Sequence, residues 1–346
     1  MDLNGLSYDS LKTVLKHMEA NRRFDMARRL PSIRVAEKAA PLHIRRLEFD
    51  TDSINVNGMI YRATLFETFP SGARREIEES IDEHGFKVDP NSVVFPGDVR
   101  MMDWNEPGAM QQRKMKDVRN LRLQLYVYNS PPWIYDVPFT TKKFEVIKRL
   151  SDMFFGNRKA EWKVTTLCPP SGIMRWPLKG MKPKVHQISI HSEFLMDALP
   201  LIVDPSSFPM NIVRFSCGAL AEDLNHPTVT NAKELRFGHV ISRELLLQLR
   251  HPKVSVMGEV PAADLNACVN QWMRERRSIG VHYSIRYDEE PKELLEMISS
   301  RPEVLKKSER CVELAMGSTA ILKISYLEVK VHLSVWFLDM RVCRRQ

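Results

Sequence analysis

The chain has 346 residues, of which 43% are hydrophobic and 27% are charged, and its formal net charge is +8 at pH 7. This composition is ordinary for a globular protein, and the length is enough for two or three domains with a sizeable core. The sequence contains no apolar run of bilayer length, and its N-terminus has an early Asp2 and no apolar stretch. We therefore expect no transmembrane helix and no secretory signal.

The cysteines indicate the redox compartment. They are widely scattered, odd in number and contain no CxxC pair: Cys168, Cys217, Cys268, Cys311 and Cys343. A disulfide framework or a structural zinc site uses closely spaced, even sets of cysteines. We therefore expect reduced thiols in an intracellular protein, either cytoplasmic or nuclear.

The first forty residues predict short helices. Leu11, Val14, Leu15 and Met18 follow the spacing i, i+3, i+4, i+7, which gives one apolar stripe on a helix. Either Ser7 or Asp9 is a suitable N-cap for that helix.

We expect the polar Ala20–Asn21 step to end the first helix. A second helix then carries Phe24 and Leu30 and ends before Pro31, and Ser32 caps a third one that ends at Pro41. Helices this short need packing partners, either in the rest of the chain or in another protein.

The segment LSYDSLKTVLKHMEANRR, with the later LPSIR and EKAAPLHIRRLEF, resembles the opening of a large nematode family of F-box-like proteins. Ser7 stands where many F-boxes have proline. The positions that match the F-box pattern are Leu6, Asp9, Leu11, Val14, Leu15, Met18, Glu19, Phe24, Ile33 and Arg34. The resemblance extends from the N-terminus to about the middle of the chain.

The resemblance implies that residues 1–42 form a helical hook, which docks on the adaptor subunit of a cullin–RING (SCF-type) ubiquitin ligase. The implied partner-binding residues are Leu6, Leu11, Val14, Leu15, Met18 and Phe24. The rest of the chain would then hold a protein substrate. The alternative from the residues alone is a helical bundle that packs only onto its own domain.

Residues 43–140 predict a small α+β domain. Asn57-Gly58 between extended runs is typical of a type I′ turn in a β-hairpin. Further expected features are a helix over Ser71 to His84 with Ile77 and Ile81 inward and Gly85 past its end, a turn at Phe95 to Asp98, a long loop over Arg100 to Lys116 and a half-buried strand over Leu121 to Val127.

Residues 141–346 predict an irregular α/β region. Strands and helices alternate with a strand-to-strand spacing of roughly 19 to 28 residues, the range of leucine-rich repeats, although the strict consensus is absent. A stripe of Phe144, Ile147, Leu150 and Phe154 predicts a helix that ends at Gly156, and further helices are expected over Glu193 to Leu201 and over Ala262 to Glu275. Asn266 to Arg274 resembles a Trp-bearing helix of the F-box-associated regions in nematode proteins. From Cys311 onward the pattern predicts antiparallel strands. The expected fold class of the whole chain is therefore α+β.

No motif for catalysis or cofactor binding is present in the sequence. His186 and His191 lie five apart on a predicted strand, on opposite faces, which disfavours a shared metal. We therefore expect no catalytic, cofactor-binding or metal-binding residue and a protein that is not an enzyme. We also expect no membrane partner, and nucleic acid is not the expected partner.

The sequence favours a protein-interaction adaptor, with two alternatives. One is an intracellular binding scaffold with a decayed F-box, which Ser7 favours. The other is a basic nucleic-acid-binding protein, which is disfavoured because the basic residues are spread along the chain instead of forming one continuous run.

Overall fold

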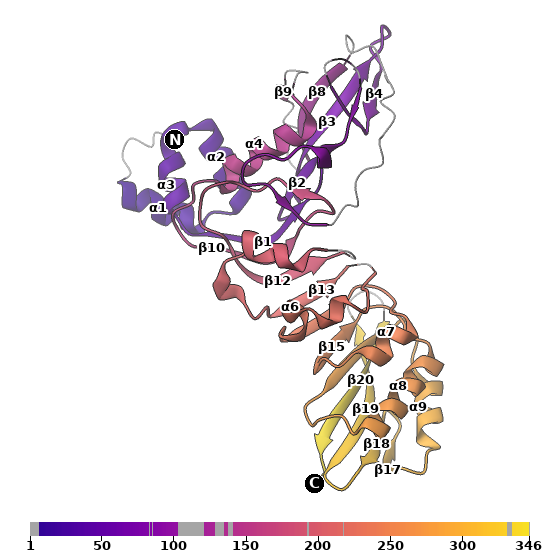
Figure 1. Cartoon of the computed structure of the whole chain (residues 1–346). Coiled ribbons are helices and arrows are strands. Elements are labelled where there is room, and N and C mark those ends of the chain that lie inside the picture. The colour runs from indigo at the N-terminus through magenta and orange to yellow at the C-terminus, as the bar shows by residue number, and fades with distance from the viewer. Residues whose placement is uncertain are drawn as a thin grey trace. The chain divides into compact units, whose positions relative to one another are not determined.

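A computed structural model of the chain (Figure 1) describes residues 7–82, 84, 86–102, 121–128, 135–137, 141–191, 194–216, 218–330 and 334–345. The fold is α+β, as predicted. Contacts within the chain define two compact units. Unit 1 comprises Met1–Ile188 with Glu193–Ser207, and unit 2 comprises Ser189–Ser192 with Phe208–Gln346.

The division into domains at residues 42 and 140 stays a prediction. Strands on either side of residue 140 nevertheless belong to one sheet, because β1 (Leu42–Phe49) pairs in parallel with β10 (Trp162–Cys168).

The N-terminal helices have the expected number and order, with different boundaries. They are α1 (Tyr8–His17), α2 (Ala20–Arg29), a 3-10 turn (Pro31–Ile33) and α3 (Arg34–Ala39). Ser7 is the N-cap of α1, and its Oγ accepts a hydrogen bond from the Ser10 amide at 3.2 Å.

The break between the first two helices lies at Met18 and Glu19, two residues earlier than predicted. The Glu19 carboxylate caps α2 by accepting hydrogen bonds from the amides of Asn21 and Arg22, so Ala20 and Asn21 lie inside the helix. Ser32 is not a cap, because the 3-10 turn that starts at Pro31 runs directly into α3.

The main sheet of unit 1 mixes parallel and antiparallel pairs. The strands β12, β10 and β1 are parallel neighbours, and the strands from β1 through β2, β3 and β8 to β9 are antiparallel. The further bounds are β2 (Ser53–Val56), β3 (Met59–Thr68), β4 (Arg74–Ile77), β8 (Leu121–Tyr128), β9 (Tyr135–Val137) and β12 (Lys184–Ile190).

Four short strands also lie in unit 1. β7 (Val99–Arg100) pairs with β11 (Ile173–Met174), and β5 (Ser80–Ile81) pairs with β6 (Lys87–Val88).

The β2–β3 hairpin and the strand β8 confirm the predictions. Asn57 and Gly58 both have positive φ angles, 54° and 91°, as a type I′ turn requires. The predicted turn at Phe95 to Asp98 is also present, with the Asp98 amide donating to the Phe95 carbonyl. Most of the predicted loop over Arg100 to Lys116 lies outside the described residues.

The predicted helix over Ser71 to His84 is wrong. Residues Arg74–Ile77 form β4, which pairs with β3, and Ser80–Ile81 form β5. Ile77 and Ile81 are buried as expected, but they lie on strands. Their i, i+4 spacing is the same as that of an apolar stripe on a helix. The edge of β3 supplies hydrogen-bond partners for β4, which favours the strand. Gly85, the predicted helix end, lies outside the described residues.

The helix α4 (Lys143–Phe155) confirms the predicted stripe and its end at Gly156. It packs on β3 and β2, and its last turn joins an aromatic core. Phe155 stacks on Trp162 with ring centroids 5.2 Å apart, and Trp162 in turn stacks on Trp176.

Unit 2 continues the alternation of strands and helices. Its parallel strands are β13 (Ile212–Phe215), β14 (Glu234–Phe237), β15 (Lys253–Val256) and β16 (His282–Tyr287). The predicted antiparallel end consists of β20 (Ser334–Arg344), β19 (Ala320–Lys330), β18 (Cys311–Met316) and β17 (Val304–Ser308).

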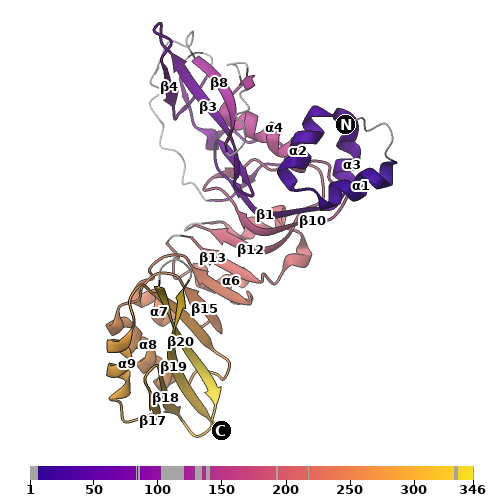
Figure 2. The same cartoon turned by 180° about the vertical axis from the view of Figure 1, so that it is seen from behind.

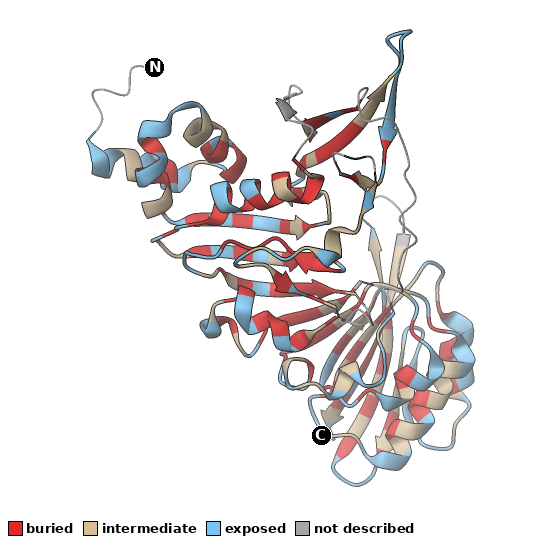
Figure 3. Ribbon diagram, turned by 45° about the horizontal axis from the view of Figure 1, so that its top comes forward, coloured by how far each residue is buried: buried red, intermediate tan, exposed pale blue. Residues whose placement is uncertain are grey.

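The main helices of unit 2 lie on one side of these strands (Figures 1 and 2). They are α7 (Arg243–Gln248), α8 (Ala262–Glu275) and α9 (Lys292–Ser299), and the predicted bounds of α8 are matched. Trp272 of α8 contacts Tyr283 of β16 edge-on, with ring centroids 4.7 Å apart. In Figure 3 buried residues alternate with more exposed ones along the strands.

One short helix is smaller than predicted, and another was not predicted. The helix expected over Glu193 to Leu201 is a 3-10 turn (Met196–Ala198) followed by α5 (Leu199–Ile202) in unit 1, and Glu193 lies outside the described residues. α6 (Pro227–Thr230) lies between β13 and β14. No helix among the described residues is both long and apolar enough to cross a membrane.

Two glycines in unit 1 test how tightly its loops pack. Gly97 and Gly72 both have positive φ, but a Cβ on Gly97 would lie 2.5 Å from the Leu178 amide nitrogen, whereas a Cβ on Gly72 would meet nothing within 4 Å. We expect Gly97→Ala to lower the free energy of unfolding by about 3 kcal/mol, and Gly72→Ala by about 1 kcal/mol. Urea denaturation measures both, and equal losses would contradict the tight packing at Gly97.

Candidate partner-binding site

The structure separates the predicted partner-binding residues into different environments. Leu15 has no exposed surface, and Phe24 is 4% exposed. Leu11 and Met18 are partly buried, whereas Val14 is 47% exposed. Leu6 lies outside the described residues.

The apolar stripe of α1 faces the hook itself. Leu15 forms a small core with Ile33, Ala36 and Ala40, and Leu11 and Met18 pack against that core. These three stripe residues are therefore brought together by α3, and they hold the helices to one another.

Phe24 belongs to a second cluster, on the side of α2 that faces α4. Its ring stacks on Phe154 of α4 with centroids 4.4 Å apart and meets Phe155 edge-on. Tyr61 of β3 also meets Phe154 edge-on, with ring centroids 4.8 Å apart. Phe24 thus anchors the hook to α4 and β3.

A buried ion cluster fixes the hook to the end of α4. The Glu37 carboxylate of α3 accepts hydrogen bonds from Arg23 of α2 at 3.0 Å and from Arg158 at 2.6 Å. All three side chains are at most 1% exposed. Two guanidinium groups thus share one carboxylate, and burial lowers the pKa of Arg23 to about 10 against the opposing effect of Glu37.

Backbone carbonyl groups accept further hydrogen bonds from Arg23. One of its terminal nitrogens also donates to the carbonyls of Glu37 and Ala40 at 2.8 and 3.1 Å, and the other donates to the carbonyl of Pro41 at 2.5 Å. Arg23 therefore holds the chain where α3 ends and β1 begins.

Lys38 adds a second link between α3 and α4. Its Nζ donates to the carbonyls of Met153 and Phe154 at 2.5 and 2.9 Å. Burial, followed by repulsion from Arg158, lowers the pKa of Lys38 to about 7. A neutral amine keeps two N–H groups, so both hydrogen bonds persist after deprotonation.

The start of α2 is tied to the β2–β3 hairpin. Asn57 donates to the Glu19 carboxylate at 2.9 Å, and Asn21 donates to the Val56 carbonyl at 2.9 Å. The Tyr61 hydroxyl donates to the Asn21 side-chain oxygen at 3.0 Å. The hook is thus fixed to the rest of unit 1 by contacts with both α4 and the β2–β3 hairpin.

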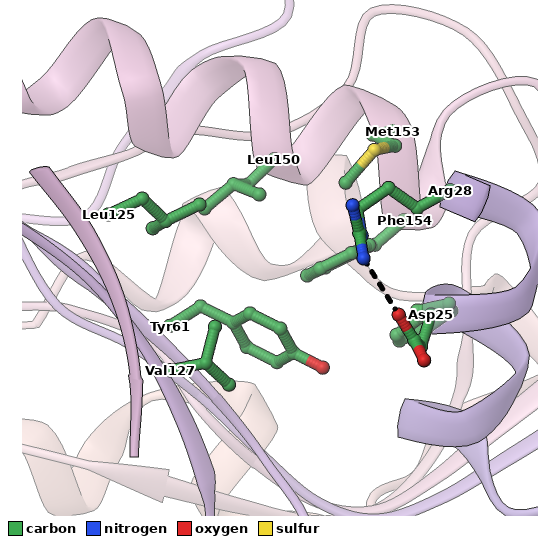
Figure 4. Close-up of a pocket in the computed structure, with 9 residues that line it drawn as sticks. Asp25, Arg28, Tyr61, Leu125, Val127, Leu150, Met153 and Phe154 are labelled. Atoms are coloured by element: carbon green, nitrogen blue, oxygen red, sulfur yellow. Dashed lines mark hydrogen bonds and ion pairs between the residues drawn. The ribbon is translucent and has the colours of Figure 1, made fainter. Parts of the chain in front are cut away.

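A small apolar pocket of about 140 Å³ lies where α2, β3, β8 and α4 meet. Figure 4 shows Asp25 and Arg28 of α2 pointing toward each other beside it, joined by an ion pair of 3.1 Å. The apolar lining comes from Phe24, Tyr61, Leu125, Val127, Leu150, Met153 and Phe154. The pocket is thus an apolar gap between the hook and the rest of unit 1.

The described residues contain no group of three or more His, Cys, Asp or Glu side chains placed to hold a metal ion. The predicted lack of catalytic and cofactor-binding residues stays a prediction.

One known family matches part of the chain. A domain of unknown function (DUF3557) matches residues 143–289, fewer than half of the residues, from the start of α4 to just beyond β16. No curated protein and no solved structure matches the chain. The resemblance of the first forty residues to an F-box stays a prediction.

Glu37 is the position most sensitive to a change of charge. Glu37→Gln leaves Arg23 and Arg158 buried without a counter-charge, so we expect a loss of about 3–5 kcal/mol in the free energy of unfolding of unit 1. Glu161→Gln is the matched control, because its partners Lys163 and Lys184 are well exposed, and we expect it to be neutral. Urea denaturation measures both, and a neutral Glu37→Gln would contradict the role of the cluster.

Lys38 predicts a pH dependence. Its folded pKa of about 7 lies below the unfolded value of 10.5, so between these values the unfolded chain binds a proton that the folded chain lacks. We therefore expect the stability from Lys38 to rise between about pH 7 and pH 10.5, and to be lost as the pH falls from 10.5 to about 7. Denaturation of wild type and Lys38→Met at about pH 7 and pH 9 tests this, and the same pH trend in both proteins would contradict it.

Proposed function

We propose that the protein is a protein-interaction adaptor whose hook docks on a larger complex while the α/β units hold a second protein. The observation that carries the proposal is that the hook is fixed to the rest of unit 1 and still exposes large apolar side chains. Tyr8 is 50% exposed, Val14 is 47% exposed and Val35 of α3 is 67% exposed. Apolar side chains displayed on fixed helices are suited to bind a partner's groove.

The F-box resemblance of the hook supplies the partner: the adaptor subunit of a cullin–RING ubiquitin ligase. In this proposal Leu11, Leu15 and Met18 maintain the hook, and Val14 makes the contact. An intracellular location is consistent with the free thiols of Cys268, Cys311 and Cys343.

A second candidate is a binding scaffold without contact to a ligase. Ser7 favours it, because the residue in the position of the usual F-box proline instead serves as the N-cap of α1. Both candidates share the substrate-holding α/β units, and they differ only in whether the hook binds the ligase adaptor.

Co-purification with the ligase adaptor subunit tests the proposal. We expect the full chain to bind it, and Val14→Asp with Val35→Asp to weaken binding at least about tenfold, because two charges replace exposed apolar contacts. A change at Leu15 is unsuitable, because it would disrupt the core of the hook.

The matched control is Thr13→Asp with Ser32→Asp, which adds the same charge at exposed polar positions of the same segment. The control should bind like wild type. A wild-type chain that does not bind the adaptor would leave the scaffold as the function, and equal binding by both double variants would exclude Val14 and Val35 from the interface.

A further inference from the structure

The sheet of unit 2 has one covered and one open face. On the covered face, the paired residues Leu235, Val254, Tyr283 and Met340 of four neighbouring strands are all buried. Trp272 of α8 contacts Tyr283, which identifies this as the helix side. Side chains alternate along a strand, so the intervening residues form the opposite face.

The open face is polar and carries mostly positive charge. One row of paired residues contains Glu234, Lys253, His282 and Arg341, and the next row contains Arg214, Arg236, Ser255, Ser284 and Asp339. Arg286 follows on β16. The arginines and lysines of this face therefore outnumber its carboxylates.

The two signs of charge lie at different depths. The side chains of Lys253 and Arg341 are each 53% exposed and that of Arg236 is 40% exposed, whereas those of Glu234 and Asp339 are only 9% and 13% exposed. Glu234 pairs with Arg236 and Lys253, and Asp339 pairs with Arg341. The buried carboxylates hold the cations in place, and the surface offered to a partner is cationic.

Arg214 extends the positive surface toward β13. Its guanidinium lies over the neighbouring strand, where a Cβ on Gly238 would be 3.2 Å from its Nη2. No ion pair is formed by Arg214 within the described residues.

Aliphatic side chains adjoin the cations. Met257, which follows β15, is 39% exposed, and Leu327 of β19 is 46% exposed. Leu327 lies in the row of Arg286 and Phe337. The face thus combines a cationic area with an apolar margin.

We propose that this open sheet face binds an acidic polypeptide segment that also carries aliphatic side chains. Carboxylates of the partner meet Arg214, Lys253 and Arg341, and its aliphatic residues meet Met257 and Leu327. Complementary charge sets the partner choice and the association rate. This inference names the substrate class of the proposed adaptor, and it rests on that function only for its biological role.

A polypeptide fits the face better than a nucleic acid does. Single-stranded nucleic acids are bound by several aromatic side chains that stack on successive bases. Among the described residues of this margin, Phe337 is the only aromatic one, and it lies between the aliphatic Met257 and Leu327.

The test measures binding by the full chain of a fluorescent peptide of alternating glutamate and leucine. We expect the triple variant Arg214→Gln, Lys253→Gln and Arg341→Gln to weaken binding at least about tenfold. This set leaves Arg236 beside Glu234 and His282 beside Asp339, so no buried carboxylate loses its last partner.

A second triple variant supplies the matched control on the helix side. Arg243→Gln, Arg250→Gln and Lys292→Gln remove the same charge, and these side chains are 55% to 58% exposed, close to the 53% of Lys253 and Arg341. We expect this variant to weaken binding about twofold at most. Urea denaturation of both variants shows whether each remains folded.

Three outcomes would overturn the inference: equal weakening by both triple variants, equal binding of a glutamine–leucine peptide, or tighter binding of a single-stranded oligonucleotide of the same length. The result is independent of the hook. Peptide binding without ligase-adaptor binding leaves the inference intact and removes the ligase function, and the reverse result removes only the inference.

Discussion

The buried carboxylate of Glu37 is the interaction on which the position of the hook depends. It joins Arg23 of α2 and Arg158 of the segment after α4, two residues that are far apart in the sequence. Burial removes each guanidinium from water, and this desolvation costs free energy. The ion pairs offset that cost while Glu37 is ionised and correctly placed. Lys38, with its lowered pKa, brings a further donor into the same junction. The cluster therefore specifies one arrangement of the hook on the rest of unit 1.

This arrangement assigns different roles to the residues of one helix. Leu15 and its neighbours are buried in the core of the hook, and Phe24 is buried in the aromatic contact with α4. Val14 and Val35 remain exposed on helices that are held by the core of the hook and by the ion cluster. A fixed surface loses little conformational entropy when it binds a partner. In the proposed function, the hook combines internal stability with a surface for docking, and the polar face of unit 2 is the proposed site for a second protein.

Local signals predicted much of the fold. Asn57-Gly58 located a hairpin, apolar spacing located α4, and the alternation of strands and helices located α8. The strand β4 was missed because Ile77 and Ile81 have helical spacing, and only the edge of β3 decides in favour of a strand. The ion cluster was beyond prediction, since Arg158 and Glu37 are 121 residues apart. For the candidate site, periodicity grouped Val14 with Leu15, although the position of α3 buries one and exposes the other.

Hydrogen exchange of the full chain, with and without the ligase adaptor subunit, tests the central claim most directly. The account predicts slower exchange of amides in α1 and α3 when the adaptor is bound, because those helices carry the exposed Val14 and Val35. Amides in the strands of unit 2 should be unchanged. Unaltered exchange in both helices at saturating adaptor would contradict the claim that the hook is a docking element.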